Sequence, residues 1–278
     1  MTTLYVSDLD GTLLTRNHEI SPFSAGVIQD LIDNHIHFTY ATARSFASAQ
    51  AVTAGLRTRL PVIVNNGAFI MDPATGVPLF SAYFQQEEKM EVARLLARHQ
   101  LFPLVYSQQE GVERVCWLTG EENEGMRYYF RQRPGDKRFQ PLSSPEGLYA
   151  GDVFYFICMG ERDTLLPVYE ALRDHPHYQC ILQQELYRTE YWCEIMPKPA
   201  TKANAILKLK EKLECTRVVC FGDGLNDLPM FAVADECYAV SNAVETLKAA
   251  ATGIIGANSE DGVACWLKEH AAPYIKRG

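Results

Sequence analysis

The pattern of apolar and polar residues predicts alternating strands and helices over the first 70 residues. Short apolar runs at 3–6, 37–41 and 61–64 are typical of buried strands. Between them, an apolar stripe at helical spacing covers residues 22–34, and a second helix is expected at about 46–56. This alternation predicts a parallel sheet with crossover helices, which is an α/β fold with a Rossmann-like core.

From about residue 84 the pattern loses this alternation and predicts a separate α+β module with mostly antiparallel strands. A Pro-, Gly- and Ser-rich stretch at about 133–151 is expected to be a loop. The expected helices cover about 86–99, 122–132 and 162–174. The expected strands cover about 102–106, 114–119, 153–158, 178–183 and 186–195. We therefore expect a cap domain over 84–194, inserted between the two halves of the core domain, 1–83 and 195–278.

The last part of the chain returns to the first pattern. A helix is expected from about 200 to 213 and a buried strand at 217–221. Two short strands at 236–240 and 253–255 precede a helix that ends at about 270. These elements complete the parallel sheet of the core domain.

Polar groups gather where the predicted parallel strands end, and ligands bind at that edge in such sheets. Asp8 and Asp10 follow the first strand, and a side-chain period of two would let them point the same way if the extended geometry held. Two carboxylates so close repel each other, and they usually share a cation or a proton. Thr42 and Asn66 follow the next two strands, and a second acidic, Gly-rich loop at 222–227 follows a later one.

Composition narrows the class of protein. The 278 residues are 47% hydrophobic, which is enough for two domains with their own cores. A net charge of -8 argues against a nucleic-acid or anionic-membrane partner, so an anionic substrate would need local positive charge or a metal. There is no apolar run of 18 residues and no basic and apolar leader at the N-terminus, which favours a cytoplasmic protein. The sequence leaves the oligomeric state open.

The eight cysteines are expected to be buried, reduced thiols. None forms a Cys-x-x-Cys pair, most lie in apolar runs, and a chain of this length does not need disulfides for stability. They are Cys116, Cys158, Cys180, Cys193, Cys215, Cys220, Cys237 and Cys265.

Four motifs in order resemble the haloacid dehalogenase-like superfamily of phosphohydrolases, and within it the Cof-type sugar-phosphate phosphatases. They are Asp8-Leu-Asp-Gly-Thr, Thr42-Ala-Arg, Lys202 after Pro197 and Thr201, and Gly222-Asp-Gly-Leu-Asn-Asp. The resemblance covers nearly all of residues 1–82 and 197–270. The second motif is usually Thr-Gly-Arg in this group. Ala43 keeps the backbone N–H that would contact the phosphate, but its Cβ puts in doubt how closely the phosphate can approach.

The resemblance implies an Mg²⁺-dependent phosphatase for small phosphorylated metabolites, with sugar phosphates as the expected class. Asp8 would attack phosphorus, and Asp10 would protonate the leaving oxygen and then activate water. The metal would be held by Asp8, the Asp10 backbone carbonyl and Asp223. Thr42, Ala43 and Lys202 would contact the phosphate. Asn226 or Asp227 would complete or orient the metal shell. Arg44 and Asn66 are candidate substrate contacts.

Several alternatives stay open at this stage. Thr42 could cap the next helix, Asp227 could be a structural cap rather than a ligand, and Arg44 could pair with a local acid. A sugar phosphomutase would share the first steps of the reaction. A catalytically silent phosphometabolite-binding protein is a further alternative, although binding alone does not require a nucleophile.

Overall fold

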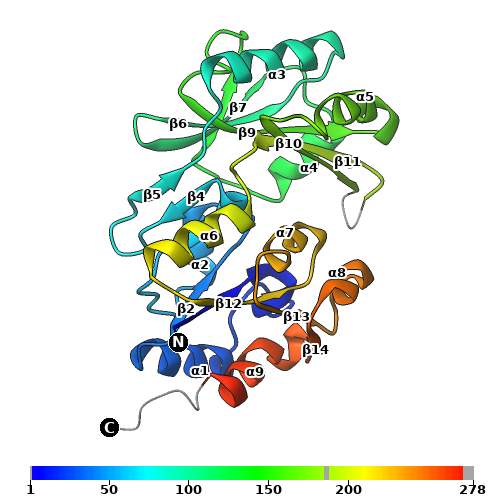
Figure 1. Cartoon of the computed structure of the whole chain (residues 1–278). Coiled ribbons are helices and arrows are strands. Elements are labelled where there is room, and N and C mark those ends of the chain that lie inside the picture. The colour runs from blue at the N-terminus through cyan, green and yellow to red at the C-terminus, as the bar shows by residue number, and fades with distance from the viewer. Residues whose placement is uncertain (1, 185–187, 272–278) are drawn as a thin grey trace. The chain divides into compact units, whose positions relative to one another are not determined.

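The computed structural model of the chain describes residues 2–184 and 188–271. The chain divides into two compact units. The first combines Met1–Ser81 with Pro199–Gly278, and the second is Ala82–Lys198. Figure 1 shows the elements of both along the chain.

A five-stranded parallel sheet in the order β14-β13-β12-β1-β2 forms the centre of the first unit. Its strands are β1 (Thr3–Ser7), β2 (His37–Tyr40), β12 (Arg217–Gly222), β13 (Glu236–Val240) and β14 (Gly253–Ile255). β1 lies between β2 and β12, so strands from both halves of the sequence pair with it. β1 and β12 are almost entirely buried, as expected for strands covered on both faces.

Helices connect these strands, and three of them begin at a residue whose side chain caps the helix. Ser21, Ser45 and Thr201 each accept a hydrogen bond from the backbone N–H three residues later. Pro22 follows Ser21 at the first helical position, where its missing N–H costs nothing. The helices are α1 (Pro22–Asp33), α2 (Phe46–Val52), α6 (Lys202–Lys212), α7 (Leu228–Phe231), α8 (Glu245–Ala250) and α9 (Gly262–His270). In Figure 1, α1 and α9 lie together at one side of the sheet, in agreement with their contacts.

The strand predicted at 61–64 belongs to a different sheet. β3 (Val62–Val64), β4 (Phe69–Met71) and β5 (Pro78–Ser81) form an antiparallel sheet, and β3 joins the parallel sheet only through a bridge between Ala41 and Ile63. β4 and β5 were not predicted, because they are short and lie close to Pro and Gly residues.

A six-stranded sheet in the order β10-β11-β9-β6-β7-β8 forms the second unit. Its strands are β6 (Leu104–Gln109), β7 (Val112–Leu118), β8 (Phe139–Leu142), β9 (Asp152–Gly160), β10 (Tyr178–Gln184) and β11 (Tyr191–Pro197). Its helices are α3 (Gln86–Arg98), α4 (Glu124–Arg131) and α5 (Arg162–Leu172). All the pairings are antiparallel except that of β7 with β8.

Two predictions in this unit need correction. The stretch 133–151 is not only a loop, because it contains β8, an edge strand that carries Pro141. The strand predicted at 186–195 begins later, at Tyr191, and continues to Pro197; residues 186–187 of that prediction lie outside the described residues. In the first unit, the helix expected at 46–56 ends at Val52.

The predicted fold class is confirmed, with a parallel α/β core and an additional α+β sheet. All eight thiols are free, seven of them buried, and only Cys265 is exposed. Within 2–184 and 188–271, no helix combines the length and the apolar character needed to cross a membrane.

Candidate active site

The ends of β1 and β12 bring the two acidic loops together. The Asp8 N–H donates to the Phe221 carbonyl over 2.9 Å, which extends the parallel pairing of these strands to the first carboxylate. Beyond Asp8 the chain turns sharply through Leu9–Leu13, where Gly11 has a φ of +76°. Beyond Gly222, the second loop leads into the turn η3 (Leu225–Asp227). Both acidic loops therefore lie at the carboxyl edge of the parallel sheet.

Lys202 lies between two buried carboxylates. Its Nζ donates to Asp8 Oδ1 over 2.6 Å and to Asp227 Oδ1 over 2.7 Å, and all three side chains are buried. Burial alone would lower the pKa of Lys202, but Asp227 and Asp8 outweigh it and raise the pKa. The ammonium is therefore charged at neutral pH, and one of its three N–H groups has no acceptor in the part of the chain that the structure describes.

Asp227 holds the second acidic loop in shape. Its Oδ2 accepts hydrogen bonds from the N–H groups of Asp223 and Gly224, at 2.9 and 3.0 Å, while Oδ1 accepts from Lys202. A Cβ at Gly222 would lie 2.8 Å from the Asp227 side chain, so this position has no room for one. Both oxygens of Asp227 thus have partners, and the geometry favours its structural role over that of a metal ligand.

Asp223 faces the first acidic loop. Its Oδ1 accepts a hydrogen bond from the Thr12 hydroxyl over 2.8 Å. A Cβ at Gly11 would come within 2.3 Å of Asp223 Oδ2, so the two loops can approach this closely only with glycine at position 11. Thr12 is part of the first motif, but nothing in the local sequence indicates its hydrogen bond to Asp223.

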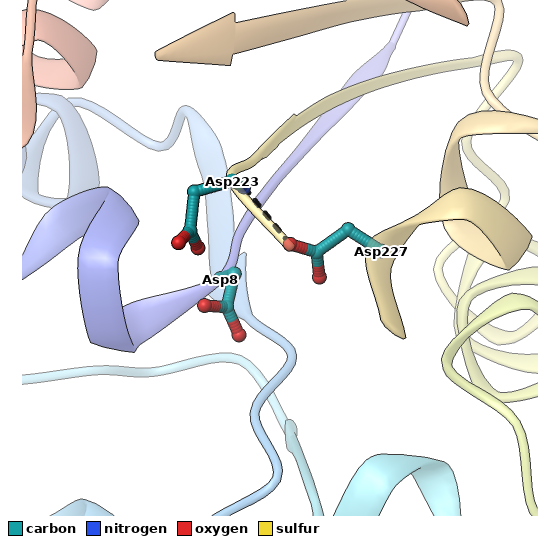
Figure 2. Close-up of side chains that lie close together, drawn as sticks. All are labelled: Asp8, Asp223 and Asp227. Carbon is teal, nitrogen blue, oxygen red and sulfur yellow. Dashed lines mark hydrogen bonds between the residues drawn. The ribbon is translucent and has the colours of Figure 1, made fainter. Parts of the chain in front are cut away.

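Three carboxylates converge at this edge. Figure 2 shows Asp8, Asp223 and Asp227 reaching inward from the ends of β1 and β12 and from η3. One oxygen from each lies within 4.8 Å of the others. Burial raises the pKa of Asp8 well above its usual range; Lys202 opposes this shift, and Asp227 and Asp223 add to it. Burial and Asp227 likewise raise the pKa of Asp223 to about 6. Hard oxygen ligands that repel one another in this way fit a divalent cation such as Mg²⁺.

Asp10 lies apart from these carboxylates. The regular strand that would point Asp8 and Asp10 the same way is interrupted by the tight turn Leu9–Leu13, although Asp10 itself keeps extended dihedrals, with φ of -72° and ψ of 126°. The Asp10 carboxylate is paired instead with Arg44, at 2.7 Å to each oxygen, and with His18 Nδ1 at 3.0 Å. Burial would raise the pKa of Asp10, but the hydrogen bonds and charge of Arg44, with His18, lower it. The two carboxylates thus have separate cationic partners.

The remaining predicted phosphate groups follow β2. Thr42 is buried, and its Oγ1 accepts the Arg44 N–H over 3.1 Å, which leaves its own hydroxyl proton available to a ligand. Ala43 is exposed beside it, and among the described residues its N–H has no recorded acceptor. Thr42 does not cap α2, because Ser45 has that role.

Asn66 and Asn226 occupy tight turns beside this region. Asn66 has a φ of +54°, and its N–H donates to the Thr42 carbonyl. Its Oδ1 is buried and is the only such side-chain atom in the described ranges without a hydrogen-bond partner. A Cβ at Gly224 would lie 2.6 Å from Asn226 Oδ1.

Two residues that contact this site were not found from the sequence. His18 bonds Asp10 from a polar loop, and Ser48 accepts a hydrogen bond from Arg44 Nη1 over 3.0 Å. A single exposed His and a helical Ser carry no local signal, since each reaches the site only through the tertiary fold.

The parallel α/β core thus holds a buried Lys between carboxylates, which are the kinds of charged group that phosphoryl transfer uses. The chain belongs to the haloacid dehalogenase-like hydrolase family, whose model matches residues 5–267. A 5-amino-6-(5-phospho-D-ribitylamino)uracil phosphatase of Bacillus subtilis is 27% identical, over 94% of this chain and 96% of its own length. An HMP-PP phosphatase of Serratia proteamaculans is 25% identical, over 99% and 98%.

Solved structures agree on the fold. A haloacid dehalogenase-like hydrolase from Bacteroides thetaiotaomicron superposes with a TM-score of 0.78 at 22% identity, covering 97% of this chain and 99% of its own. These comparisons confirm the resemblance drawn from the four motifs. They also confirm the predicted class of enzyme, a phosphoric monoester hydrolase.

Proposed function

We propose that this protein hydrolyses small phosphate monoesters, sugar phosphates in particular, with Mg²⁺ and through a phosphorylated Asp8. The observation that carries the proposal is the buried contact of Lys202 with Asp8, at 2.6 Å, beside Asp223. Burying a carboxylate costs desolvation free energy, and a protein that only binds its ligand would gain nothing from it. A nucleophile, in contrast, needs a fixed position and a nearby positive charge that offsets its own.

The reaction proceeds in two steps. An Asp8 oxygen bonds to phosphorus as the phosphorus–alcohol oxygen bond breaks, and Asp10 gives its proton to the departing oxygen. The ionised Asp10 then takes a proton from water, which attacks phosphorus, so that phosphate leaves and the Asp8 carboxylate is restored. Lys202 stabilises the charge on the phosphoryl oxygens with its remaining N–H, and the Thr42 hydroxyl and Ala43 N–H bind the same group.

The residues present fit a divalent cation. Asp8 and Asp223, with the Asp10 carbonyl, would hold it, and Asp227 would orient Asp223 through the loop N–H groups. Bound there, the cation supplies the positive charge that lets an anionic carboxylate and an anionic phosphate approach each other. We place Asn226 in the surrounding shell, where it would orient a ligand.

The substrate class is proposed from the relatives. Two of them are named as phosphatases of small phosphorylated metabolites, which supports the same coarse class here. We propose Ala82–Lys198 as the domain that selects among such metabolites, with Asn66 as a candidate contact from the core. A cytoplasmic location and the absence of a nucleic-acid partner stay predictions.

A turnover assay tests the proposal directly. We expect hydrolysis of an aryl phosphate with Mg²⁺ and its loss on addition of EDTA. Asp8→Asn keeps the shape but removes the attacking charge, so turnover should fall about 10³-fold or more while the fold survives. Asp33→Asn is a matched control, because Asp33 makes exposed contacts away from the site, namely ion pairs with Arg57 and Arg59 and a hydrogen bond from the Gln29 side chain. Activity that is indifferent to EDTA, or retained in Asp8→Asn, would refute the mechanism.

A further inference from the structure

The turn that follows β13 contacts both acidic loops. The Asn242 side chain donates from Nδ2 to the Gly11 carbonyl over 2.8 Å, in the turn that follows Asp8. Two residues further on, the backbone N–H of Val244 donates to the Asp223 carbonyl over 2.9 Å. The short segment 242–244 therefore joins the two loops from which the proposed metal ligands come.

The hydrogen bonds of the Asn242 side chain connect it to distant parts of the sequence. Besides its contact with Gly11, its Oδ1 accepts the Asn258 N–H over 2.9 Å. The turn that carries Asn242 closes through its own backbone, from the Ala243 N–H to the Val240 carbonyl. Both ends of the amide thus join other loops, and its own turn has a separate backbone bond.

Asn258 holds the far end of the turn that Asn242 contacts. It is buried, and its Nδ2 donates to the Leu14 carbonyl over 2.8 Å. The Leu14 N–H in turn donates to the Leu9 carbonyl over 2.8 Å and closes the turn. Two asparagines that follow β13 and β14 therefore hold two carbonyl groups of the loop that carries Asp10.

This support matters because the turn is shaped around Asp223. The Thr12 hydroxyl donates to Asp223 Oδ1 over 2.8 Å, and the space beside Asp223 Oδ2 is too small for a Cβ at Gly11. With Oδ1 paired to Thr12, Oδ2 is the oxygen that can bind a cation. The Asp10 carbonyl, the ligand proposed from this turn, directly precedes Gly11 in the chain.

We propose that Asn242 is a positioning residue that sets the spacing between the Asp10 carbonyl and the Asp223 carboxylate, and with it the affinity of the site for Mg²⁺. The inference rests on the proposed function. Asn242 acts through the backbone of Gly11 and is not itself a ligand. Without its amide, the turn would have to be ordered each time a cation binds, and this cost lowers the affinity.

A purely structural role for Asn242 predicts a different result. Hydrogen bonds of an exposed amide contribute little to the stability of a folded chain, because water replaces them. A structural residue would lower Tm in the absence of metal and leave the affinity for Mg²⁺ unchanged. A positioning residue would change the affinity and leave the metal-free protein nearly as stable as before.

The experiment measures Mg²⁺ binding to Asn242→Ala without substrate. Calorimetric titration of the whole chain with Mg²⁺ gives Kd, and thermal unfolding with and without Mg²⁺ gives the stability of both forms. We expect Kd for Mg²⁺ to rise about 10-fold, as is typical for residues that orient metal ligands. The Tm of the metal-free protein should fall by less than about 4 °C.

Asn34→Ala is the matched control. Asn34 is also exposed, and its Nδ2 donates to the Asp30 carbonyl over 2.7 Å, so the same substitution removes the same kind of bond. Asn34 lies at the end of α1, shortly before β2 begins, and therefore at the amino edge of the parallel sheet. Asn34→Ala should bind Mg²⁺ with the Kd of the unmodified protein.

An unchanged Kd in Asn242→Ala, with or without a fall in Tm, would overturn the inference. An equal rise of Kd in Asn34→Ala would overturn it as well, because the effect would then not depend on the site. If Asn242→Ala does not fold, Asn242→Ser decides by the same titration, since its hydroxyl is too short to join Gly11 and Asn258. Failure of the proposed function is distinguishable, because the unmodified protein would then show neither heat of binding nor a change in Tm with Mg²⁺.

Discussion

The ammonium of Lys202 lies 2.6 Å from an Asp8 oxygen, and the two side chains are only 1% and 7% exposed. A buried ion pair of this kind is costly to break, because removing one partner leaves the other charge in a poorly solvated place. Here the same cation also contacts Asp227, so its loss would leave two carboxylates without their shared partner.

Lys202→Met keeps the length of the side chain and removes the charge. We expect turnover to fall by at least about 10²-fold and unfolding free energy to fall by about 3 kcal/mol at pH 8. The pKa of Asp8 is already raised and rises further without Lys202. A carboxyl group whose pKa is higher in the folded than in the unfolded chain stabilises the fold at pH values below its pKa in the unfolded chain, and this stabilisation is lost as pH rises. The loss of stability in Lys202→Met should therefore be smaller at pH 5 than at pH 8.

Urea unfolding at the two pH values measures this effect. Lys210→Met is the matched control, since Lys210 is partly exposed and pairs with Asp235 at 3.4 Å. A defect of equal size at pH 5 and pH 8 would contradict the role assigned to the buried charges.

Gly11→Ala should damage the site without a change of charge. The new Cβ would meet Asp223 Oδ2 at 2.3 Å, at a backbone φ of +76° that side chains rarely adopt. We expect a loss of about 1–3 kcal/mol in stability and a large loss in metal affinity, because Asp223 must move. Gly26→Ala is the control with the opposite sign. It lies in α1 with no atom within 4 Å of the new Cβ, and should stabilise by up to about 1 kcal/mol.

Metal binding should weaken as pH falls through about 6. Burial and Asp227 raise the pKa of Asp223 to about 6, so below that value a proton competes with the cation. In the metal-free protein this raised pKa stabilises the fold at low pH, and the contribution is lost between about pH 4 and pH 6. Added Mg²⁺ should therefore raise Tm more at pH 7.5 than at pH 5. Thermal scans with and without Mg²⁺ measure the difference, and an equal Tm increase at both pH values would contradict it.

Isotope transfer separates a phosphatase from a phosphomutase. Both would phosphorylate Asp8 and use Asp10, but only the phosphatase lets water reach the phosphorylated enzyme. A sugar phosphate incubated in ¹⁸O-water with Mg²⁺ should release inorganic phosphate that carries the label. An isomeric sugar phosphate with little free phosphate, and a need for a bisphosphate activator, would point to the mutase instead.

Removal of Ala82–Lys198 should leave a folded α/β core. The segment has its own buried cluster, which includes Phe84, Val105 and Phe156, so its loss should not empty the core of the first unit. With a Gly/Ser linker in its place, we expect some aryl phosphatase activity and a loss of selectivity among natural substrates. An insoluble product would show that the two units depend on one core.

The sequence was sufficient for features that local pattern determines. The alternating elements and the loops at strand ends follow from periodicity and residue type. β8 could not be predicted, because Phe-Gln-Pro-Leu has no alternating pattern and is held by its pairing with β7. β4 and β5 are equally short and depend on tertiary pairing.

The residues of the site could be predicted better than their partners. Asp8, Asp223 and Lys202 come together as expected, because parallel strands end at one edge. The pairing of Asp10 with Arg44 joins residues 34 apart through the turn at Leu9–Leu13, whose shape the sequence did not reveal. The role of Asp227 was open between ligand and cap, and only its hydrogen bonds to two loop N–H groups favour the latter.

The place of β1 in the sheet also matters while the chain is being made. β1 pairs with β2 on one side and with β12 on the other. β2 emerges from the ribosome soon after β1. The pairing with β12 begins with Thr3 opposite Arg217, a residue made much later. Until that residue is synthesised, the edge of β1 that leads to Asp8 has no strand beside it. The intervening module is one continuous stretch, so it can assemble first. Asp8, the proposed nucleophile, is therefore translated long before Lys202, Asp223 and Asp227, the charged groups that surround it in the folded protein.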